Sequence, residues 1–235
     1  MEEKVNTVVL PGDVIYELEA TSDDKEAFRF GPGIREESGK IMSSKAGVLR
    51  TKEPNILWID SNQRRYVPAR NDKVVGIITK TGKESYKVDI GSSCTAGLGN
   101  LSFEGATKRN KPNLQIGDLV YARLSMVNKD MEPELTCMDT TGKSNGLGQL
   151  NGGFLIKVSL RLARKLLRPD HIVLALLGRH FPFEVTVGLN GRIWINSKGI
   201  LNTIAVANAI TNSEFLGDKE IKTMVDKIVN ELRKS

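Results

Sequence analysis

Residues 101–113, LSFEGATKRNKPN, combine an aromatic side chain with closely spaced cations. Phe103 lies five residues before Lys108, and Arg109 and Lys111 follow in the same segment. An aromatic ring offers a face on which any base can stack, and lysine and arginine side chains neutralise phosphates. The segment therefore predicts contact with single-stranded nucleic acid. The alternative interpretation is a solvated basic loop, because exposed runs of charge are common.

Residue types that carry catalysis or bind metals are scarce. The chain has only two histidines and two cysteines: His171, His180, Cys94 and Cys137. Neither histidine has a carboxylate or a cysteine at metal-ligand spacing, and the distant cysteines indicate a reducing compartment and no thiolate zinc site. Carboxylates that could hold Mg²⁺ lack a paired spacing: Glu104, Glu132 and Glu134. We expect no enzyme, no metal and no cofactor.

The composition of the 235 residues favours an acidic partner. The formal net charge is +6 and the isoelectric point is about 9.3. Nucleic acid is favoured over a membrane, because the cations do not gather on one long amphipathic helix. No apolar run is long enough to span a bilayer, and the chain has no leader-like start. We expect a soluble protein with no membrane partner and no small-molecule substrate.

Short β-rich runs separated by turn residues fill the first 139 residues. Residues 1–66 predict an N-terminal β module. The following runs predict five strands: VVGIITKT, SYKVDI, GNLSF, DLVYARLSMV and ELTCMD. Five short strands with a KTGKE hairpin connection are typical of a small Greek-key barrel of OB type, which we place at residues 67–145. The segment at 101–113 then connects the third and fourth strands.

The pattern changes after residue 139. Residues 140–153 are dense in glycine and asparagine and predict a linker. The order β-α-α-β-β-α with an extra helix follows, which is typical of a KH domain and which we place at residues 152–235. The expected fold class is therefore multidomain, with an N-terminal β module, an OB barrel and a C-terminal KH-like domain of α+β type.

A KH domain grips a nucleic-acid backbone with a GxxG loop between two helices. The match in this chain, GLNG from Gly188 to Gly191, joins two predicted strands instead. Asn190 and Gly191 both tolerate positive φ, so we interpret GLNG as a structural hairpin turn. Cations in and beside the first predicted helix are candidates for phosphate contact, or a solvated helix face: Arg161, Arg164, Lys165 and Arg168.

The domain order and several segments together resemble the cap subunits of the eukaryotic RNA exosome, and among them the ribosomal RNA-processing protein 40 family. The resemblance covers essentially the whole chain, from VVLPGD onward. It is carried by RRYVP at 64–68, LSFEGATKRNKPN at 101–113, NKDMEPEL at 128–135 and GLNGRIW at 188–194.

This resemblance implies an S1-type central barrel and a subunit without a catalytic centre. It implies a place on a ring of RNase PH-like subunits beside other cap subunits, where the protein guides single-stranded 3′ ends of RNA to a separate exonuclease. The implied processes are rRNA processing and RNA decay in the nucleus and nucleolus, and also in the cytoplasm. In this family a GxNG pattern, here Gly188, Asn190 and Gly191, supports packing against the barrel.

Two positions depart from the usual S1 pattern. S1 barrels typically present an aromatic residue in the second strand and a histidine in the third, where this chain has Lys87 and Asn100. Lys87 is a candidate RNA contact through its charge. Strand alternation places Tyr86 on the opposite face from Lys87. We therefore expect the loop cations to matter more than stacking, with Phe103 packed beneath its loop. The rival hypotheses are a mainly structural clamp and a free-standing S1/KH RNA-binding factor.

Overall fold

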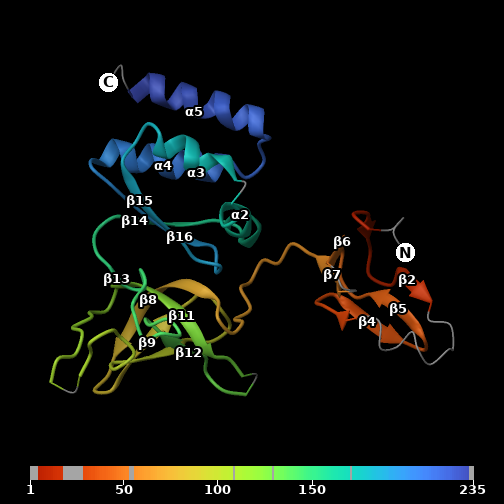
Figure 1. Ribbon diagram of the computed structural model, residues 1–235, viewed down its shortest axis with the longest axis horizontal. Coiled ribbons are helices and arrows are strands. Elements are labelled where there is room, and N and C mark those ends of the chain that lie inside the picture. Colours follow the sequence, from red (N-terminus) through yellow and green to blue (C-terminus); the bar gives the residue numbers. More distant parts are fainter. Residues whose placement is uncertain are drawn as a thin grey trace. The chain divides into compact units, whose positions relative to one another are not determined.

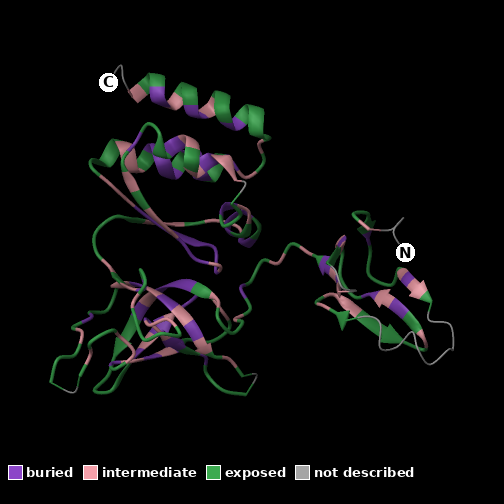
Figure 2. Cartoon of the chain, viewed as in Figure 1, coloured by how far each residue is buried: buried purple, intermediate pink, exposed green. Residues whose placement is uncertain are grey.

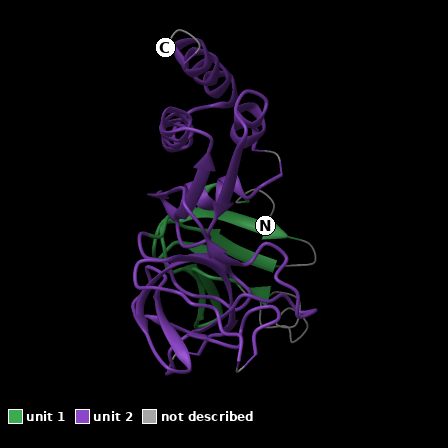
Figure 3. Ribbon diagram, turned by 90° about the vertical axis from the view of Figure 1, so that its left-hand side faces the viewer, with its two compact units in different colours: residues 1–63 green, residues 64–235 purple. Residues whose placement is uncertain are grey.

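The computed structural model describes residues 5–17, 29–52, 56–107, 109–128, 130–169 and 171–232. The chain divides into two compact units, residues 1–63 and residues 64–235 (Figure 3). In the described residues, no helix has both the length and the apolar character needed to cross a membrane.

The first unit is built from strands, as the sequence predicts. Its strands are β1 (Val8–Val9), β2 (Val14–Glu17), β3 (Arg29–Phe30), β4 (Ile34–Glu37), β5 (Lys40–Ser43), β6 (Gly47–Lys52) and β7 (Ile56–Asp60). They form a four-stranded sheet of order β1-β6-β7-β3 and a three-stranded sheet of order β2-β5-β4 (Figure 1). The apolar core of the unit is small: Val9, Ile15, Ile41, Leu49 and Ile59.

The second unit begins with the predicted barrel. Its strands are β8 (Lys73–Thr81), β9 (Ser85–Asp89), β10 (Ala96–Gly99), β11 (Leu119–Met126), β12 (Glu134–Thr136) and β13 (Gly148–Leu150). They follow the order β12-β10-β9-β8-β11-β13, and β12 also pairs with β11. This second pairing closes five strands into a barrel, so the expected fold class is confirmed here.

Two elements differ from the sequence prediction. The third barrel strand is Ala96–Gly99 instead of the predicted GNLSF run, because Ala96 and Leu98 fill the barrel core and are fully buried. The stretch predicted as a linker contains β13, which pairs with β11, and the buried Leu147 just before it joins the barrel core. The linker interpretation is therefore wrong at this strand.

The rest of the unit has the predicted β-α-α-β-β-α order with an added helix. Its elements are β14 (Phe154–Lys157), α2 (Leu160–Leu166), α3 (Ile172–Gly178), β15 (Phe183–Val187), β16 (Arg192–Ser197), α4 (Ile200–Asn212) and α5 (Asp218–Leu232). Helix α2 begins after Ser159, whose Oγ accepts a hydrogen bond from Leu162 N and caps the helix. The sheet order is β14-β16-β15, and the central strand β16 is mostly buried (Figure 2).

Candidate nucleic-acid interface

Residues 101–113, called the cation loop below, are tied to the turn between β8 and β9. The Lys111 Nζ donates a hydrogen bond to the Lys83 carbonyl at 3.2 Å. The Tyr86 hydroxyl donates to the Pro112 carbonyl at 2.5 Å. These bonds fix the end of the cation loop against the hairpin, so its cations project from a rigid barrel rather than from a free chain.

Asn100, which precedes the cation loop, is buried and does not lie on an RNA-facing surface. Its backbone N–H donates to the Glu84 carbonyl, and its side-chain Nδ2 donates to the Lys83 carbonyl at 2.9 Å. Only 5% of its surface is exposed, and its Oδ1 has no partner among the described residues. The expectation that Asn100 replaces an exposed histidine is therefore wrong. Its physical role is to end β10 and start the loop.

Phe103 packs against the apolar core of the barrel. The next residue, Glu104, accepts a hydrogen bond from Ser144 N at 2.7 Å, and this bond holds the pKa of Glu104 below its ordinary value. The ring is therefore only half-exposed, and the carboxylate is already engaged.

The three candidate cations of the loop differ in their surroundings. Lys108 lies outside the described residues. Arg109 is exposed and has no hydrogen-bond or ion-pair partner within the described ranges, whereas Lys111 uses Nζ to hold the hairpin. Arg109 is thus the described loop cation that is most available to phosphate. Contact of all three with RNA stays a prediction.

Lys87 lies on the outer face of the barrel. Its sequence neighbour Tyr86 is only 5% exposed, whereas the Lys87 side chain is 40% exposed, as expected for alternation along β9. The Lys87 Nζ forms an ion pair with the Glu132 carboxylate. The position that carries an aromatic residue in typical S1 barrels is therefore occupied by a neutralised cation.

The α2 cations lie on the solvent side of a short helix. Arg161 and Arg164 are exposed, and Lys165 is half-buried. The other side of α2 packs into the KH core: Leu162, Ala163 and Leu166. These three cations stay predicted RNA contacts, on a different domain from the cation loop.

The GLNG turn joins β15 to β16 and packs directly on the barrel. The Asn190 amide makes three hydrogen bonds to barrel backbone: Oδ1 accepts from Val75 N at 3.2 Å, and Nδ2 donates to Val75 O at 2.8 Å and to Ile90 O at 2.9 Å. Leu189 N donates to the Lys73 carbonyl at 2.9 Å. The side-chain amide of Asn190 therefore forms hydrogen bonds with the barrel backbone as a neighbouring strand would.

Both glycines of the turn are required by close packing. A Cβ at Gly188 would lie 2.7 Å from Val75 N and 2.4 Å from Asn190 Oδ1. Gly191 has φ of +75°, and a Cβ there would lie 2.6 Å from the Val158 carbonyl. A side chain at Gly188 would clash with the barrel backbone, and a side chain at Gly191 would clash with the backbone of the KH domain itself. We call this contact the barrel–KH junction.

An ion pair that the sequence did not indicate completes the junction. The Arg192 guanidinium donates to the Asp89 carboxylate at 2.6 Å and to the Asp89 backbone carbonyl. The Arg192 side chain is 6% exposed and that of Asp89 is 41% exposed. The two residues are 103 positions apart, so only the position of Arg192 directly after GLNG hinted at a role.

This ion pair should make stability depend on pH in the acidic range. Burial alone would raise the pKa of Asp89, but the Gly91 N–H and the Arg192 guanidinium outweigh it and hold that pKa below its ordinary value. A carboxyl group whose pKa is lower in the folded state contributes stability that is fully present above about pH 3.9, the pKa of an aspartate in the unfolded chain. This stability is lost as the pH falls through the pKa of the folded state.

We expect Asp89→Asn to lower the free energy of unfolding by about 1–2 kcal/mol at pH 7, because a nearly buried guanidinium loses its counter-charge. The difference from wild type should shrink as pH falls below about 4, where the wild-type carboxylate also becomes neutral. Urea unfolding at a series of pH values measures it. A difference that stays constant down to pH 2 would contradict the assignment.

The barrel–KH junction and the cation loop lie at opposite ends of the β8–β9 hairpin. The junction uses Val75 near the start of β8 and Asp89 at the end of β9, whereas the loop is bonded to Lys83 in the turn. At about 3.3 Å per strand residue, roughly 20 Å separate Val75 from the end of β8 at Thr81. One end of the barrel thus binds the KH domain, and the cation loop lies at the other end.

Three family models match separate parts of the chain. The S1 domain of exosome complex component RRP40 matches residues 66–148. A KH domain model matches residues 153–200, and the N-terminal model of mammalian exosome complex component RRP40 matches residues 7–62.

Relatives named exosome complex component RRP40 match most of the chain. The Drosophila melanogaster protein is 45% identical, over 97% of this chain and 96% of its own length. The chain belongs to the exosome complex component RRP40 family. The Homo sapiens RRP40 is 43% identical over 84% of this chain and 74% of its own, and the Saccharomyces cerevisiae RRP40 is 38% identical over 88% of both.

A solved structure supports the same placement. The crystal structure of a protein assigned as an exosome complex RNA-binding protein matches with a TM-score of 0.60 and 25% identity, over 72% of this chain and 98% of that chain. In this RRP40-family chain the S1 match contains the cation loop, Val75 and Asp89, and the KH match contains Asn190 and Arg192. The barrel–KH junction therefore joins the two domains that the S1 and KH family models match.

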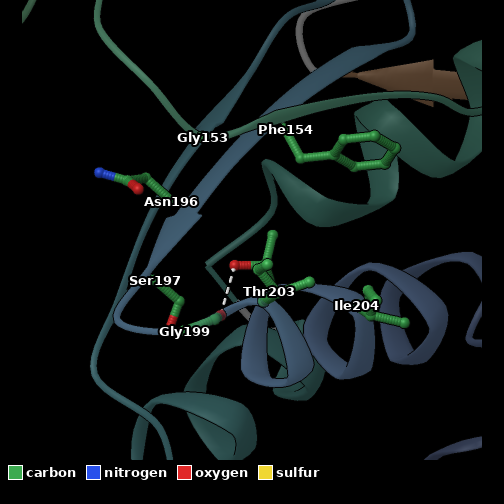
Figure 4. Close-up of a pocket in the computed structure, with 8 residues that line it drawn as sticks. Gly153, Phe154, Asn196, Ser197, Gly199, Thr203 and Ile204 are labelled. Atoms are coloured by element: carbon green, nitrogen blue, oxygen red, sulfur yellow. Dashed lines mark hydrogen bonds between the residues drawn. The ribbon is translucent and has the colours of Figure 1, made fainter.

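The KH domain of this RRP40-family chain also has an open hollow of about 530 Å³ between the end of β16 and the start of α4 (Figure 4). It is lined by Gly153, Phe154, Asn196, Ser197, Gly199, Ile200, Thr203 and Ile204. None of these side chains titrates, so the hollow lacks the groups that general acid–base chemistry needs. Among the described residues, no three His, Cys, Asp or Glu side chains are grouped to hold a metal.

Proposed function

We propose that the protein is a non-catalytic RNA-binding cap subunit of the RNA exosome. The observation that carries the proposal is the match, over most of both chains, to proteins named exosome complex component RRP40. The cation loop, at the end of the barrel opposite the KH domain, supports RNA binding, because it presents charge from a fixed position.

The proposed partners are single-stranded 3′ ends of RNA, the RNase PH-like ring subunits and the other cap subunits. The subunit would stabilise the ring and guide RNA to the 3′-to-5′ exonuclease in rRNA processing and RNA decay. We propose action in the nucleus and nucleolus, and also in the cytoplasm. Imaging of a tagged copy tests the location.

Native purification of the tagged protein tests the assembly. We expect RNase PH-like chains in stoichiometric amounts in the eluate. A monomer-sized species alone, on size exclusion of a native extract, would contradict the proposal and favour a free-standing S1/KH RNA-binding factor.

A mainly structural clamp is the second candidate, and specific observations favour it. Asn100 is buried, Lys87 is neutralised by Glu132, and Phe103 packs on the barrel core. Three positions that could touch RNA are therefore engaged within the protein. RNA crosslinking of the purified complex separates the candidates: crosslinks to this subunit support RNA guidance, and crosslinks confined to other subunits support the clamp.

A further inference from the structure

The outer face of the barrel carries a row of residues that strand pairing places side by side. Lys80 on β8 is paired with Lys87 on β9, Lys87 with Gly97 on β10, and Gly97 with Glu134 on β12. Directly paired residues point to the same face of a sheet. Both sequence neighbours of Lys87 are buried, so this face is the outer one. The row contains two cations, an uncovered glycine and a carboxylate.

The centre of the row is open. A Cβ at Gly97 would meet no atom within 4 Å. Beside it the surface is hollowed by about 340 Å³, and the lining consists of Gly97, Met131, Glu132, Pro133 and Glu134. This volume is near the lower end of the roughly 300–1,000 Å³ range of ligand pockets. The hollow adjoins Lys87 through the ion pair with Glu132.

The Glu132 carboxylate binds the Lys87 ammonium group as an RNA phosphate would. A carboxylate and a phosphodiester each present anionic oxygens that accept hydrogen bonds from an ammonium group. The Lys87 and Glu132 side chains are 40% and 54% exposed. Solvent screens such a pair, so its net contribution to stability is small and an incoming anion can replace the carboxylate. Lys80 has no ion-pair partner within the described part of the chain and faces solvent.

We propose that Lys80 and Lys87, beside the open surface at Gly97, form a second contact strip for the phosphodiester backbone of single-stranded RNA, and that Glu132 covers Lys87 until a phosphate displaces it. The inference rests on the proposed function, because RNA must first reach the barrel. It makes Glu132 a residue that weakens RNA binding. The strip is distinct from the cation loop, which uses no residue of this row.

The test is a mutant cycle on the full chain, with fluorescence anisotropy of a labelled 12-nucleotide oligouridylate. Glu132→Gln should tighten binding by about threefold to tenfold, because it frees Lys87 for phosphate. Lys87→Met alone should change affinity by less than about twofold, since the phosphate contact that Lys87 gains in the wild type is offset by the ion pair with Glu132 that it gives up. In the Glu132→Gln background, Lys87→Met should remove the whole gain.

Glu134→Gln is the matched control. It removes the same charge from the lining of the same hollow, but Glu134 forms no ion pair with Lys87, so we expect a change of less than about twofold. Glu132→Gln should also steepen the dependence of affinity on salt by about one phosphate contact, and Glu134→Gln should not. All of these side chains are solvent-accessible, and unchanged thermal unfolding would show that the variants fold.

Two patterns of gain would overturn the inference. One is an equal gain from Glu132→Gln and Glu134→Gln, which would show a general charge effect. The other is a gain that persists after Lys87→Met. If the wild type binds the oligouridylate and Glu132→Gln does not change its affinity, this inference alone is wrong. If neither the wild type nor any variant binds the oligouridylate, both this inference and the proposed RNA binding are wrong.

Discussion

Replacing Asn190 with alanine is expected to lower the free energy of unfolding of residues 64–235 by about 4 kcal/mol, because each buried polar group left without a partner costs about 1–3 kcal/mol. Asn190 is 8% exposed and bonds one N–H and two carbonyls of the barrel backbone. Alanine leaves all three groups of Val75 and Ile90 unpaired. Entry of water into the space vacated by the amide limits the loss.

Urea unfolding followed by tryptophan fluorescence measures this loss, since Trp194 lies on β16 directly after the junction. Asn196→Ala is the matched control in the same sheet. Its Nδ2 donates to Glu184 Oε2 at 3.5 Å in an exposed position, so we expect a loss of less than about 0.5 kcal/mol. Equal losses in the two variants would show that the junction bonds do not hold the domains together.

The junction shows what local sequence chemistry predicts and where it stops. Asn190-Gly191 predicts a hairpin turn, and the structure has one between β15 and β16. Only Gly191 adopts positive φ, however, and the Asn190 side chain bonds to the barrel. The partners of Asn190 are 115 and 100 residues away in the chain, and no local pattern reports contacts of that range.

The order of strands and helices was predictable because each element carries its own period of apolar residues. The barrel and the KH domain follow from that order, which turn residues punctuate. The third barrel strand was misplaced because AGLG has few strand-favouring residues, whereas the next residues include Leu101 and Phe103. Burial of Ala96 and Leu98 in the core outweighs this local preference.

The sequence predicts the cations of the candidate site but not the residues that these cations contact. Alternation along β9 places Lys87 outside and Tyr86 inside. The ion pair to Glu132 spans 45 residues, and the bond from Lys111 to the Lys83 carbonyl spans 28. These contacts decide which cations remain available, so charge in the sequence alone overstates the surface open to RNA. Among the described loop residues, Arg109 is the cation that has no such contact and so remains available.

Charge reversal at Arg109 and Lys111 is expected to weaken binding of a single-stranded oligouridylate by at least about tenfold near 0.1 M salt, because two phosphate contacts become repulsive. The slope of log affinity against log salt should fall by about 1.4, at about 0.7 per single-strand phosphate. Anisotropy titrations over a salt series measure both. Lys111 loses only one exposed hydrogen bond, so the fold should persist.

Lys219→Glu combined with Lys222→Glu is the matched control. Both lysines are exposed on α5, and the double variant changes the net charge by the same amount as Arg109→Glu with Lys111→Glu. An effect through net charge alone would weaken binding equally in the two variants. We expect the α5 variant to bind within about twofold of wild type, because distant exposed charges are screened by salt.

The double variant Arg109→Glu with Lys111→Glu also distinguishes RNA guidance from subunit docking. If the cation loop faces RNA, Arg109→Glu with Lys111→Glu loses RNA affinity while co-purification of RNase PH-like chains is unchanged. If the loop docks on a neighbouring subunit, co-purification falls and RNA affinity of the isolated protein is unchanged. The described residues of the loop are bonded to the β8–β9 hairpin and to no residue of the KH domain, so we do not expect either outcome to arise from a loosened barrel–KH junction.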